Sequence, residues 1–479
     1  MTPEEAAPRE LGSLLVPERL AEWVWVLAYT ALLSTLSVLR YQLWIATGFD
    51  LGLYRQGLWL LWHGGLTAPV SLLGQPLLAR DGSWVLLLLA PPYHLLGTGF
   101  LLVLQAFAFG LGYLLLRRVA QALGAAPAAA HLLGVVYLLY PVVWGANLFD
   151  FHPQALGIPL LLGTVLAALR RRPLPFLLLA AACLTVQVAM PLLLLGLGVA
   201  LLLQRRVAWG LSLLGLAAAG GLADLVLLER LGRGAPLFWS PYGYLGRTPG
   251  AGLAFLASHP GLWVRWAAAR RSWEYGVWLL LPLAGAALPE GRRLLNPWWI
   301  PALALLEANL IAALPAATDP FNEYSVLAVP FLFTAVLAAL GGRPLALGRK
   351  TASRFLLLPL LLFAVFWYHQ HQVSWHRPPG IRQLAAAVKL VPPAAPVAAQ
   401  NFVLPHLADR AGLYLPAQAA TLPAGGFVLL DPAHTTGTTP PAVLASLARS
   451  LGQPGQAAKV YAQGSVTLYR LSRPLPGPP

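Results

Sequence analysis

The 479-residue sequence contains little charge, one cysteine and only three lysines. Charged residues make up 10% of the chain and hydrophobic residues 58%, whereas a soluble domain has about 25% charged residues. A membrane span needs roughly 20 predominantly apolar residues, and the sequence has many such runs. Cys183 lies in one of these runs, so the sequence excludes a disulfide framework and a cysteine metal cluster. We therefore expect an all-α polytopic membrane protein.

The sequence also lacks the motifs of two common enzyme classes. It has no Gly-rich phosphate loop and no nucleophile elbow with its partners, so ATP-driven transport and serine hydrolysis have no support. A formal charge of +15 would suggest nucleic acid in a soluble chain. Here the arginines lie in short clusters between apolar runs, as the positive-inside rule describes, and we expect no nucleic-acid partner.

The arginine clusters predict the topology. Placing them all in the cytoplasm gives about eleven spans, an inner N-terminus and an outer C-terminus. This requires that the segment 84–96 does not cross the membrane, and its two prolines favour a re-entrant or interfacial segment. The segments 175–188 and 190–203 are either two short spans or one helix kinked at Pro191. The expected spans lie near 23–39, 100–116, 128–143, 154–169, 175–188, 190–203, 207–228, 276–289, 297–314, 325–341 and 355–369.

The last part of the chain has a different composition. Apolar runs become shorter after residue 369, and Pro, Gly and Thr become more frequent. Two helical patterns, near 381–390 and 441–451, are interspersed with strand-like runs, VAAQ, GLYLP, GFVLLD, KVYA and SVTLYRL. We predict a multi-span domain over 1–369 and a small extracytoplasmic α/β domain over 370–479.

The stretch 48–65, GFDLGLYRQGLWLLWHGG, follows the first expected span. Its apolar positions recur at helical spacing, which predicts a short helix lying on the outer membrane surface with one wet face. Asp50 begins this stretch, and Arg55 on the wet face is a candidate substrate contact. Asp50 is a candidate general base or metal ligand. The alternative is that Asp50 caps the helix that follows it.

Asp150 and His152 lie at the outer end of another expected span, in the motif FDFHP. A carboxylate and an imidazole two residues apart can share a divalent metal, and the histidine can contact a phosphate oxygen. Two ligands make an incomplete metal site, so a metal would need Asp50 as well. The alternative is helix capping and loop hydrogen bonding, with Pro153 starting the next helix.

The outer segment 229–275 is expected to be a long loop rich in arginine and aromatic residues. Arg270 in this segment is a candidate phosphate contact, although Trp, Tyr and Arg also anchor membrane proteins at the interface. Asp319 and Glu323 precede another outer helix start. Capping and helix-dipole effects explain both acids, and a substrate contact is the other interpretation.

Several segments carry a family resemblance: GFDLGLYRQGLW, APPYHLLGTGFLLVLQAF, YPVVWGANLFDFHPQALGIPLLL, EYSVLAVPFLF and NFVLPHLADRAGLYLP. Together they resemble the domain of unknown function 2079 family (DUF2079), bacterial and archaeal membrane proteins in the C-type (GT-C) glycosyltransferase superfamily. The resemblance implies a GT-C-like fold and sugar transfer from a polyprenyl-phosphate donor at the outer face of the cytoplasmic membrane. It implies a catalytic role for Asp50, and it leaves the acceptor open.

One position departs from the pattern that the resemblance implies. An acidic cluster is expected near 186–190, where this chain has Val-Gln-Val-Ala-Met. Gln187 would then take the place of an acid that contacts substrate or metal. The departure favours a second interpretation, in which the protein is a non-enzymatic binder of lipid-linked sugar, a transporter or an envelope-assembly protein.

Overall fold

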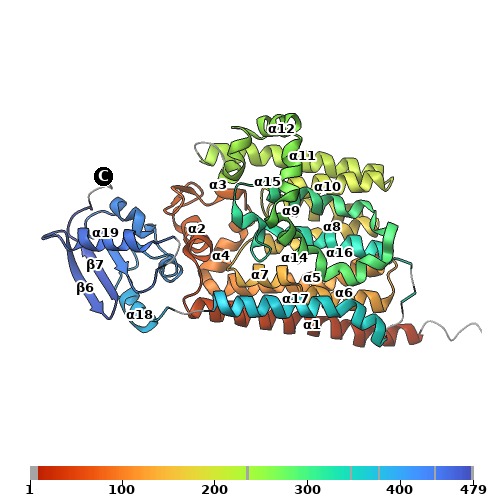
Figure 1. The fold of residues 1–479 in the computed structure, drawn as a ribbon, viewed down its shortest axis with the longest axis horizontal. Helices are drawn as coiled ribbons and strands as arrows, with labels where there is room; N and C mark the ends of the chain where they lie inside the picture. The colour runs from red at the N-terminus through yellow and green to blue at the C-terminus, as the bar shows by residue number, and fades with distance from the viewer. Residues whose placement is uncertain are drawn as a thin grey trace, which may run out of the picture.

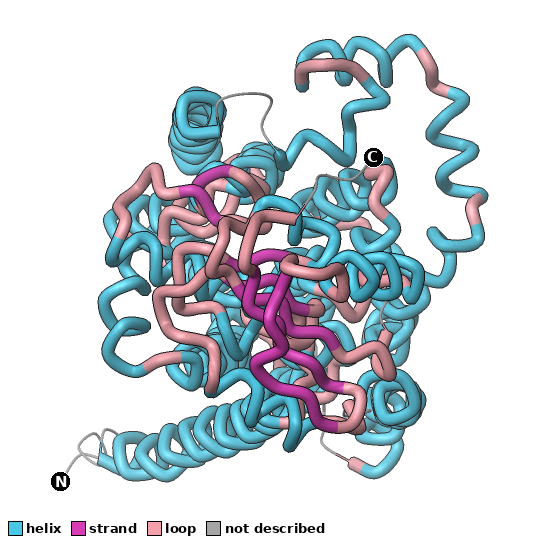
Figure 2. Tube along the Cα trace, turned by 90° about the vertical axis from the view of Figure 1, so that its left-hand side faces the viewer, coloured by secondary structure: helices cyan, strands magenta, loops and turns pink. Residues whose placement is uncertain are grey.

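The computed structural model of the chain describes residues 9–232, 237–342, 344–345, 348–375, 378–435 and 438–475. A large helical domain occupies most of the molecule, and a small sheet domain lies at one end of it (Figure 1). Figure 2, turned by 90°, shows the strands of the sheet domain in front of the helices. The expected fold class, a helical protein with a small C-terminal sheet domain, is therefore confirmed, while the boundary at residues 369 and 370 stays a prediction.

The membrane domain is built from helices of very different lengths. Its α-helices are α1 (Arg9–Gln42), α2 (Leu53–His63), α3 (Leu78–Asp81), α4 (Leu86–Leu96), α5 (Thr98–Ala122), α6 (Pro127–Leu138), α7 (Pro141–Leu148), α8 (Gln154–Leu169), α9 (Pro173–Leu184), α10 (Met190–Leu203), α11 (Val207–Gly232), α12 (Pro249–Ser258), α13 (Gly261–Ala268), α14 (Arg270–Ala287), α15 (Ile300–Ile311), α16 (Val329–Leu340) and α17 (Arg349–Ser374).

Short segments connect these helices. They are the π-helix η1 (Gly48–Gly52), the 3-10 helices η2 (Leu237–Leu245), η3 (Leu288–Leu294), η4 (Pro297–Trp299), η5 (Pro315–Thr318) and η6 (Glu323–Ala328), and the two-residue strands β1 (Pro69–Val70) and β2 (Gln75–Pro76).

Six helical stretches within the described residues are long and apolar enough to cross a membrane: Leu20–Gln42, Thr98–Ala122, Pro127–Leu148, Val207–Gly232, Glu323–Leu340 and Arg349–His371. The apolar helices α8, α9 and α10 are shorter. Helix α4 continues through Pro91 and Pro92 but has only 11 residues, fewer than the roughly 20 that a span needs. The polytopic fold is thus confirmed, while the number of eleven spans stays a prediction.

Residues 173–203 form two helices, not one kinked helix. The chain turns between α9 and α10, and Pro191 lies in the first turn of α10, where its missing N–H costs no hydrogen bond. The Arg206 guanidinium donates to the carbonyl of Ala168 at 2.9 Å. The two arginine clusters at 170–172 and 205–206 therefore lie at the same end of this helical hairpin, as the positive-inside rule requires.

The prediction of a long loop over 229–275 was wrong. Helix α11 continues to Gly232, η2, α12 and α13 occupy most of 237–268, and α14 already begins at Arg270. The sequence pattern was misleading because these helices are short and carry aromatic and arginine residues, which also suit a loop at the membrane interface.

The sheet domain contains α18 (Ile381–Lys389), α19 (Pro441–Leu451), the 3-10 helices η7 (Leu404–Leu407) and η8 (Pro416–Thr421), and a five-stranded sheet. The strands are β3 (Val397–Ala399), β4 (Leu413–Tyr414), β5 (Phe427–Leu430), β6 (Ala457–Gln463) and β7 (Val466–Leu471), in the order β4-β3-β5-β7-β6. Strand β3 pairs in parallel with β4 and β5, and β7 is antiparallel to β5 and β6.

The sheet domain packs against the membrane domain through the segment that follows α1. Buried apolar residues from 44–102 and from 384–468 form one continuous hydrophobic cluster. The His406 ring stacks on Trp44 and Tyr41, with ring centroids 3.8 and 4.6 Å apart. The 48–65 stretch therefore lies between the membrane helices and the sheet domain, and its wet face is largely covered.

Protonation of His406 should loosen this contact. Burial, followed by the nearby Arg55 charge, lowers the pKa of His406 to about 3, whereas the unfolded value is about 6.5. Below about pH 6.5 the unfolded chain takes up a proton at His406 that the folded chain does not. The free energy of unfolding therefore decreases as the pH is lowered. We expect acidification from about pH 7.5 to about pH 5 to lower the unfolding temperature less in His406→Phe, which keeps a stacking ring, than in the wild type. Equal losses in thermal unfolding would contradict this.

Candidate functional site

Asp50 lies in the π-helix η1, which follows the first membrane helix. Single π turns are rare and frequently occur at functional sites. The turn is held by Asn401 of the sheet domain, whose side-chain oxygen accepts hydrogen bonds from the backbone N–H groups of Gly48 and Phe49 at 2.9 and 3.3 Å. The orientation of Asp50 therefore depends on a residue near the other end of the chain.

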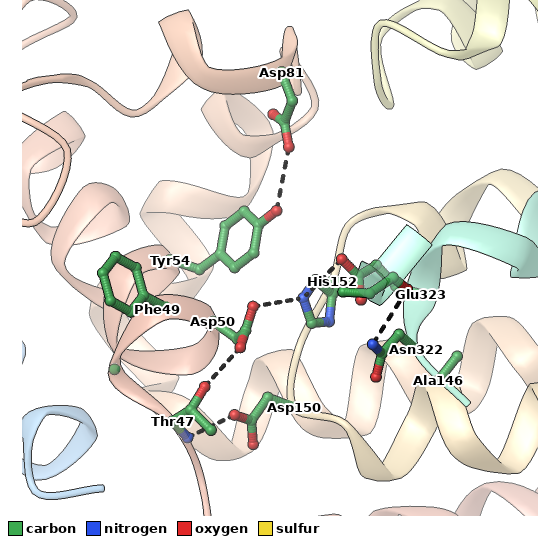
Figure 3. Close-up of polar contacts among 12 residues, drawn as sticks. Thr47, Phe49, Asp50, Tyr54, Asp81, Ala146, Asp150, His152, Asn322 and Glu323 are labelled. Atoms are coloured by element: carbon green, nitrogen blue, oxygen red, sulfur yellow. Dashed lines mark hydrogen bonds and ion pairs between the residues drawn. The ribbon is translucent and has the colours of Figure 1, made fainter. Parts of the chain in front are cut away.

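Asp50, His152 and Glu323 converge from three separate parts of the sequence (Figure 3). The Nε2 atom of His152 is 3.2 Å from Asp50 Oδ1 and 3.7 Å from Glu323 Oε1. The side chains of His152 and Glu323 are 2% and 4% exposed, whereas that of Asp50 is 15% exposed. Asp50 is therefore the member of the three that a substrate can reach most easily.

The surroundings of Asp50 favour its ionised form. Burial alone would raise the pKa of Asp50, but the hydrogen bond and charge of His152, the Thr47 hydroxyl and the Arg80 charge together hold it below its ordinary value. Burial would lower the pKa of His152, but the carboxylates of Glu323 and Asp50 outweigh this and raise it. These shifts favour a carboxylate on Asp50 facing a protonated imidazole on His152, and they keep Asp50 ionised at neutral pH.

Asp150 is linked to Asp50 through Thr47. The Thr47 hydroxyl donates to Asp50 Oδ2 at 2.7 Å, and the Thr47 backbone N–H donates to Asp150 Oδ2 at 2.7 Å. Asp150 has a φ of 72°, which is rare for a residue other than glycine. Gln105 holds this strained turn, because its side chain donates to the Asp150 carbonyl at 2.7 Å and accepts from the His152 N–H at 2.8 Å. Burial and the Asp50 charge raise the pKa of Asp150 to about 6.

The capping interpretations do not hold for these acids. The N-cap residue of η1 is Thr47 and that of α2 is Gly52, and neither helix start has a side-chain cap. The N-cap residue of α8 is Pro153, again without a side-chain cap. Helix capping therefore does not account for Asp50 or Asp150, whereas the bond from the Thr47 N–H to Asp150 is loop hydrogen bonding, the other part of the alternative for that residue.

Arg80 lies beside this cluster on α3. Its guanidinium carbon is 5.5 Å from the centre of the Tyr54 ring, and the Tyr54 hydroxyl donates to Asp81 Oδ2 at 3.4 Å (Figure 3). Among the described residues, the buried Nη1 of Arg80 has no hydrogen-bond partner. A buried guanidinium donor without a partner is costly unless a ligand satisfies it, so Arg80 is a candidate anion contact.

The predicted metal set does not form. In the described part of the chain, no group of three or more His, Cys, Asp and Glu residues is arranged to hold a metal ion. Asp50 and Asp150 each direct Oδ2 at Thr47, and His152 directs Nε2 at Asp50. Asp50 contacts His152, and Thr47 contacts both aspartates, so the three side chains lie near one another without forming a shared set of ligands.

Arg55, predicted to contact substrate, is a structural link to the sheet domain. Its Nη2 lies 2.7 Å from Asp409 Oδ2, and the same guanidinium bonds the Pro405 carbonyl and the hydroxyls of Tyr93 and Tyr41. All three guanidinium nitrogens are thus engaged by the protein. The arrangement leaves Arg55 little capacity for a ligand.

Arg270 is engaged away from the cluster, and Gln187 stays a predicted contact. Arg270 is 91% exposed at the start of α14 and pairs with Glu274, one turn later, at 2.7 Å. Gln187 lies in the turn between α9 and α10, next to α3, where the Val188 N–H donates to the Asp81 carbonyl at 2.8 Å. The turn that lacks the expected acids thus packs against Asp81, a buried acid from another segment.

Sequence reasoning missed two members of the site. Glu323 was interpreted mainly as a helix-dipole acid, and Arg80 was not singled out. The available signal was that a charged residue next to the membrane is costly without a partner. Both Glu323 and Arg80 fall on the predicted outer side. Their proximity to Asp50 is set by helix packing, which local patterns do not report.

The chain matches the model of a known protein family. The model described as "Predicted membrane protein (DUF2079)" matches residues 40–437, which is most of the chain. The chain belongs to this DUF2079 family. The resemblance predicted from GFDLGLYRQGLW and FDFHP is thereby confirmed. No curated protein matches the chain.

Two solved structures resemble this DUF2079 member in fold. A crystal structure of ArnT from Cupriavidus metallidurans bound to undecaprenyl phosphate superposes with a TM-score of 0.55 at 14% identity, covering 93% of this chain and 97% of ArnT. The apo state of the same protein gives a TM-score of 0.54 at 13% identity, covering 92% and 97%. At such low identity the likeness shows the fold alone, and it confirms the GT-C-like architecture.

Gly145 on α7 allows the segment that carries Glu323 to approach closely. A Cβ atom at Gly145 would lie 2.6 Å from the Cα of Phe321, so alanine must displace that backbone. We expect Gly145→Ala to destabilise the protein by about 1–3 kcal/mol and to lower any activity of the site. Gly215→Ala is the matched control, since its Cβ would meet nothing within 4 Å. Thermal unfolding in detergent measures both, and equal effects would contradict the close approach.

Proposed function

We propose that the protein is a GT-C-type membrane glycosyltransferase that acts at the outer face of the cytoplasmic membrane. The donor is a polyprenyl-phosphate-linked sugar, and the acceptor is a hydroxyl group presented next to Asp50. The sheet domain then lies outside the membrane. The observation that carries the proposal is the partly exposed carboxylate of Asp50, kept ionised by His152 and Thr47 within an ArnT-like fold.

The proposed reaction uses Asp50 as the general base. As Asp50 takes the proton of the acceptor hydroxyl, the acceptor oxygen attacks the anomeric carbon of the donor sugar and forms the new C–O bond. The bond between that carbon and the phosphate oxygen breaks, and the electron pair leaves with the polyprenyl phosphate. His152 stabilises the Asp50 carboxylate before transfer. Attack opposite the leaving phosphate gives inversion.

Arg80 supports the choice of a phosphate-linked donor. Its buried Nη1 lacks a partner among the described residues, and guanidinium groups bind phosphate oxygens with charge-assisted hydrogen bonds. ArnT, whose fold this chain shares, has been crystallised with undecaprenyl phosphate. In this proposal Arg80 neutralises the charge that develops on the leaving phosphate.

A non-enzymatic role is the second candidate, and one observation favours it. The turn at 186–190 has no acid, so a function that relatives assign to acids there would be changed in this chain. A lipid-linked-sugar binder, transporter or assembly protein would use the same cluster without making a glycosidic bond. Product analysis separates the two, since only the enzyme transfers the sugar to an acceptor.

Asp50→Asn should abolish transfer, because the amide keeps the size of the side chain but cannot accept the acceptor proton. We expect a loss of at least about 100-fold in sugar transfer from a radiolabelled polyprenyl-phosphate sugar in proteoliposomes. Asp150→Asn is the matched control, as an amide oxygen can still accept the Thr47 N–H, and it should retain most of the activity. Full activity of Asp50→Asn with an unchanged folded yield would remove Asp50 from the mechanism.

Glu323 should act as a positioning residue through His152. Glu323→Gln removes one of the two carboxylates that raise the His152 pKa, so His152 loses its proton at lower pH and Asp50 loses its cationic partner. We expect the alkaline limb of the pH–rate profile to move to lower pH and kcat at neutral pH to fall about tenfold.

Glu323→Asp, which keeps the charge, should restore part of this loss. A merely structural role would lower activity equally at every pH. An unshifted alkaline limb in Glu323→Gln would therefore exclude the proposed coupling between Glu323 and His152.

A further inference from the structure

A cleft of about 490 Å³ lies between the start of α14 and the segment that runs from η5 to η6. Its walls include Arg271, Glu274, Trp278, Asp319 and Phe321. The volume lies within the range of small-molecule sites, about 300–1,000 Å³. None of these residues takes part in the proposed reaction at Asp50, so the cleft can have a separate role.

The cleft and the Asp50 cluster share one short segment of the chain. Phe321 lines the cleft, and Glu323, two residues later, contacts His152 at 3.7 Å. Tyr275, which also lines the cleft, has its hydroxyl 2.8 Å from the hydroxyl of Ser325. A ligand in the cleft would thus contact the same short segment that positions His152.

The charges of the cleft favour a neutral polar ligand. Arg271 contributes one guanidinium, and one of its nitrogens already donates to the Leu310 carbonyl at 3.0 Å. Glu274 and Asp319 contribute two exposed carboxylates. Glu274 also pairs with Arg270 at 2.7 Å, and Asp319 Oδ1 accepts the Phe321 N–H at 2.9 Å. Counting Arg270, two carboxylates face two guanidinium groups, so no excess of positive charge selects an anion such as phosphate. Hydroxyl groups can donate to the remaining carboxylate lone pairs and accept from the Arg271 guanidinium.

The remaining wall of the cleft is aromatic. The rings of Trp278 and Phe321 lie edge to face, with centroids 4.8 Å apart, and both are half-buried. Such rings present apolar area beside the polar groups, a combination that suits a ligand with both apolar C–H faces and hydroxyl groups. A saccharide has both, whereas a lipid chain would leave the charged groups of the cleft desolvated without partners.

We propose that this cleft binds a saccharide, the sugar portion of the acceptor. That the bound saccharide is an acceptor rests on the proposed transferase function, whereas saccharide binding by the cleft does not. Glu274 and Asp319 accept hydrogen bonds from sugar hydroxyls, Arg271 donates to them, and Trp278 with Phe321 forms the apolar wall. The cleft would then hold the acceptor so that one hydroxyl reaches Asp50.

The test measures binding of soluble neutral saccharides to the full-length protein in lipid nanodiscs free of glycoside detergents. The probes are short oligosaccharides of N-acetylglucosamine, mannose, galactose and rhamnose, with inorganic phosphate as the anionic probe, followed by saturation-transfer NMR and calorimetry. We expect at least one oligosaccharide to bind with a Kd of about 1 mM or tighter. Glu274→Gln combined with Asp319→Asn should weaken this binding at least about tenfold.

Arg270→Gln is the matched control. It breaks the same Arg270–Glu274 ion pair that Glu274→Gln breaks, but it alters no residue that lines the cleft, so it should leave saccharide affinity unchanged. Unaltered unfolding temperatures in all variants confirm that they are folded. Absence of binding by every saccharide, equal weakening by Arg270→Gln, or competition by inorganic phosphate would each overturn the proposal.

The Asp50→Asn protein separates this inference from the proposed function. It should bind the saccharide normally while transferring no sugar. If the wild type binds saccharide but transfers no sugar, the binding proposal is supported and the transferase proposal is wrong. If the wild type transfers sugar but binds no saccharide at the cleft, the transferase proposal is supported and the binding proposal is wrong.

Discussion

The site depends on one imidazole held between two carboxylates. His152 is almost fully buried, and it faces both Asp50 and Glu323 through the same nitrogen. A cation in such a place needs compensating charge, and the two acids supply it from separate segments. The converse also holds, because the buried acids need His152 and Arg80. The ends of the helices next to these residues are thus fixed relative to one another by charge as well as by packing.

Much of this arrangement follows from local sequence patterns. Apolar runs and arginine clusters predicted a polytopic helical domain, and turn residues with short strand-like runs predicted the C-terminal sheet. Asp50, Asp150 and His152 were expected on the same face because each lies at the expected outer end of a span. Among the described residues they are not arranged as a three-ligand metal site; Thr47 instead donates its N–H and its hydroxyl to an oxygen of each aspartate.

Residues whose role depends on distant partners could not be predicted in this way. Arg55 has the spacing of a residue on the wet face of a surface helix, yet its partner Asp409 is 354 residues away in the sequence. Glu323 has the position of a helix-dipole acid, and only the packing of its segment against α7 brings it to His152. The aromatic and arginine content of 237–275 suits either a loop or short interfacial helices, so composition alone does not choose between them.

The contact between Asn401 and η1 has a consequence for the biogenesis of the protein. Gly48 and Phe49 leave the ribosome early, while Asn401, which binds their N–H groups, is synthesised more than three hundred residues later. The membrane helices precede Asn401 in the chain, so the turn that orients Asp50 acquires its partner only after the C-terminal domain has been synthesised and has folded. A chain that ends between residues 323 and 401 therefore carries Asp50, His152 and Glu323 but lacks the side chain that holds η1.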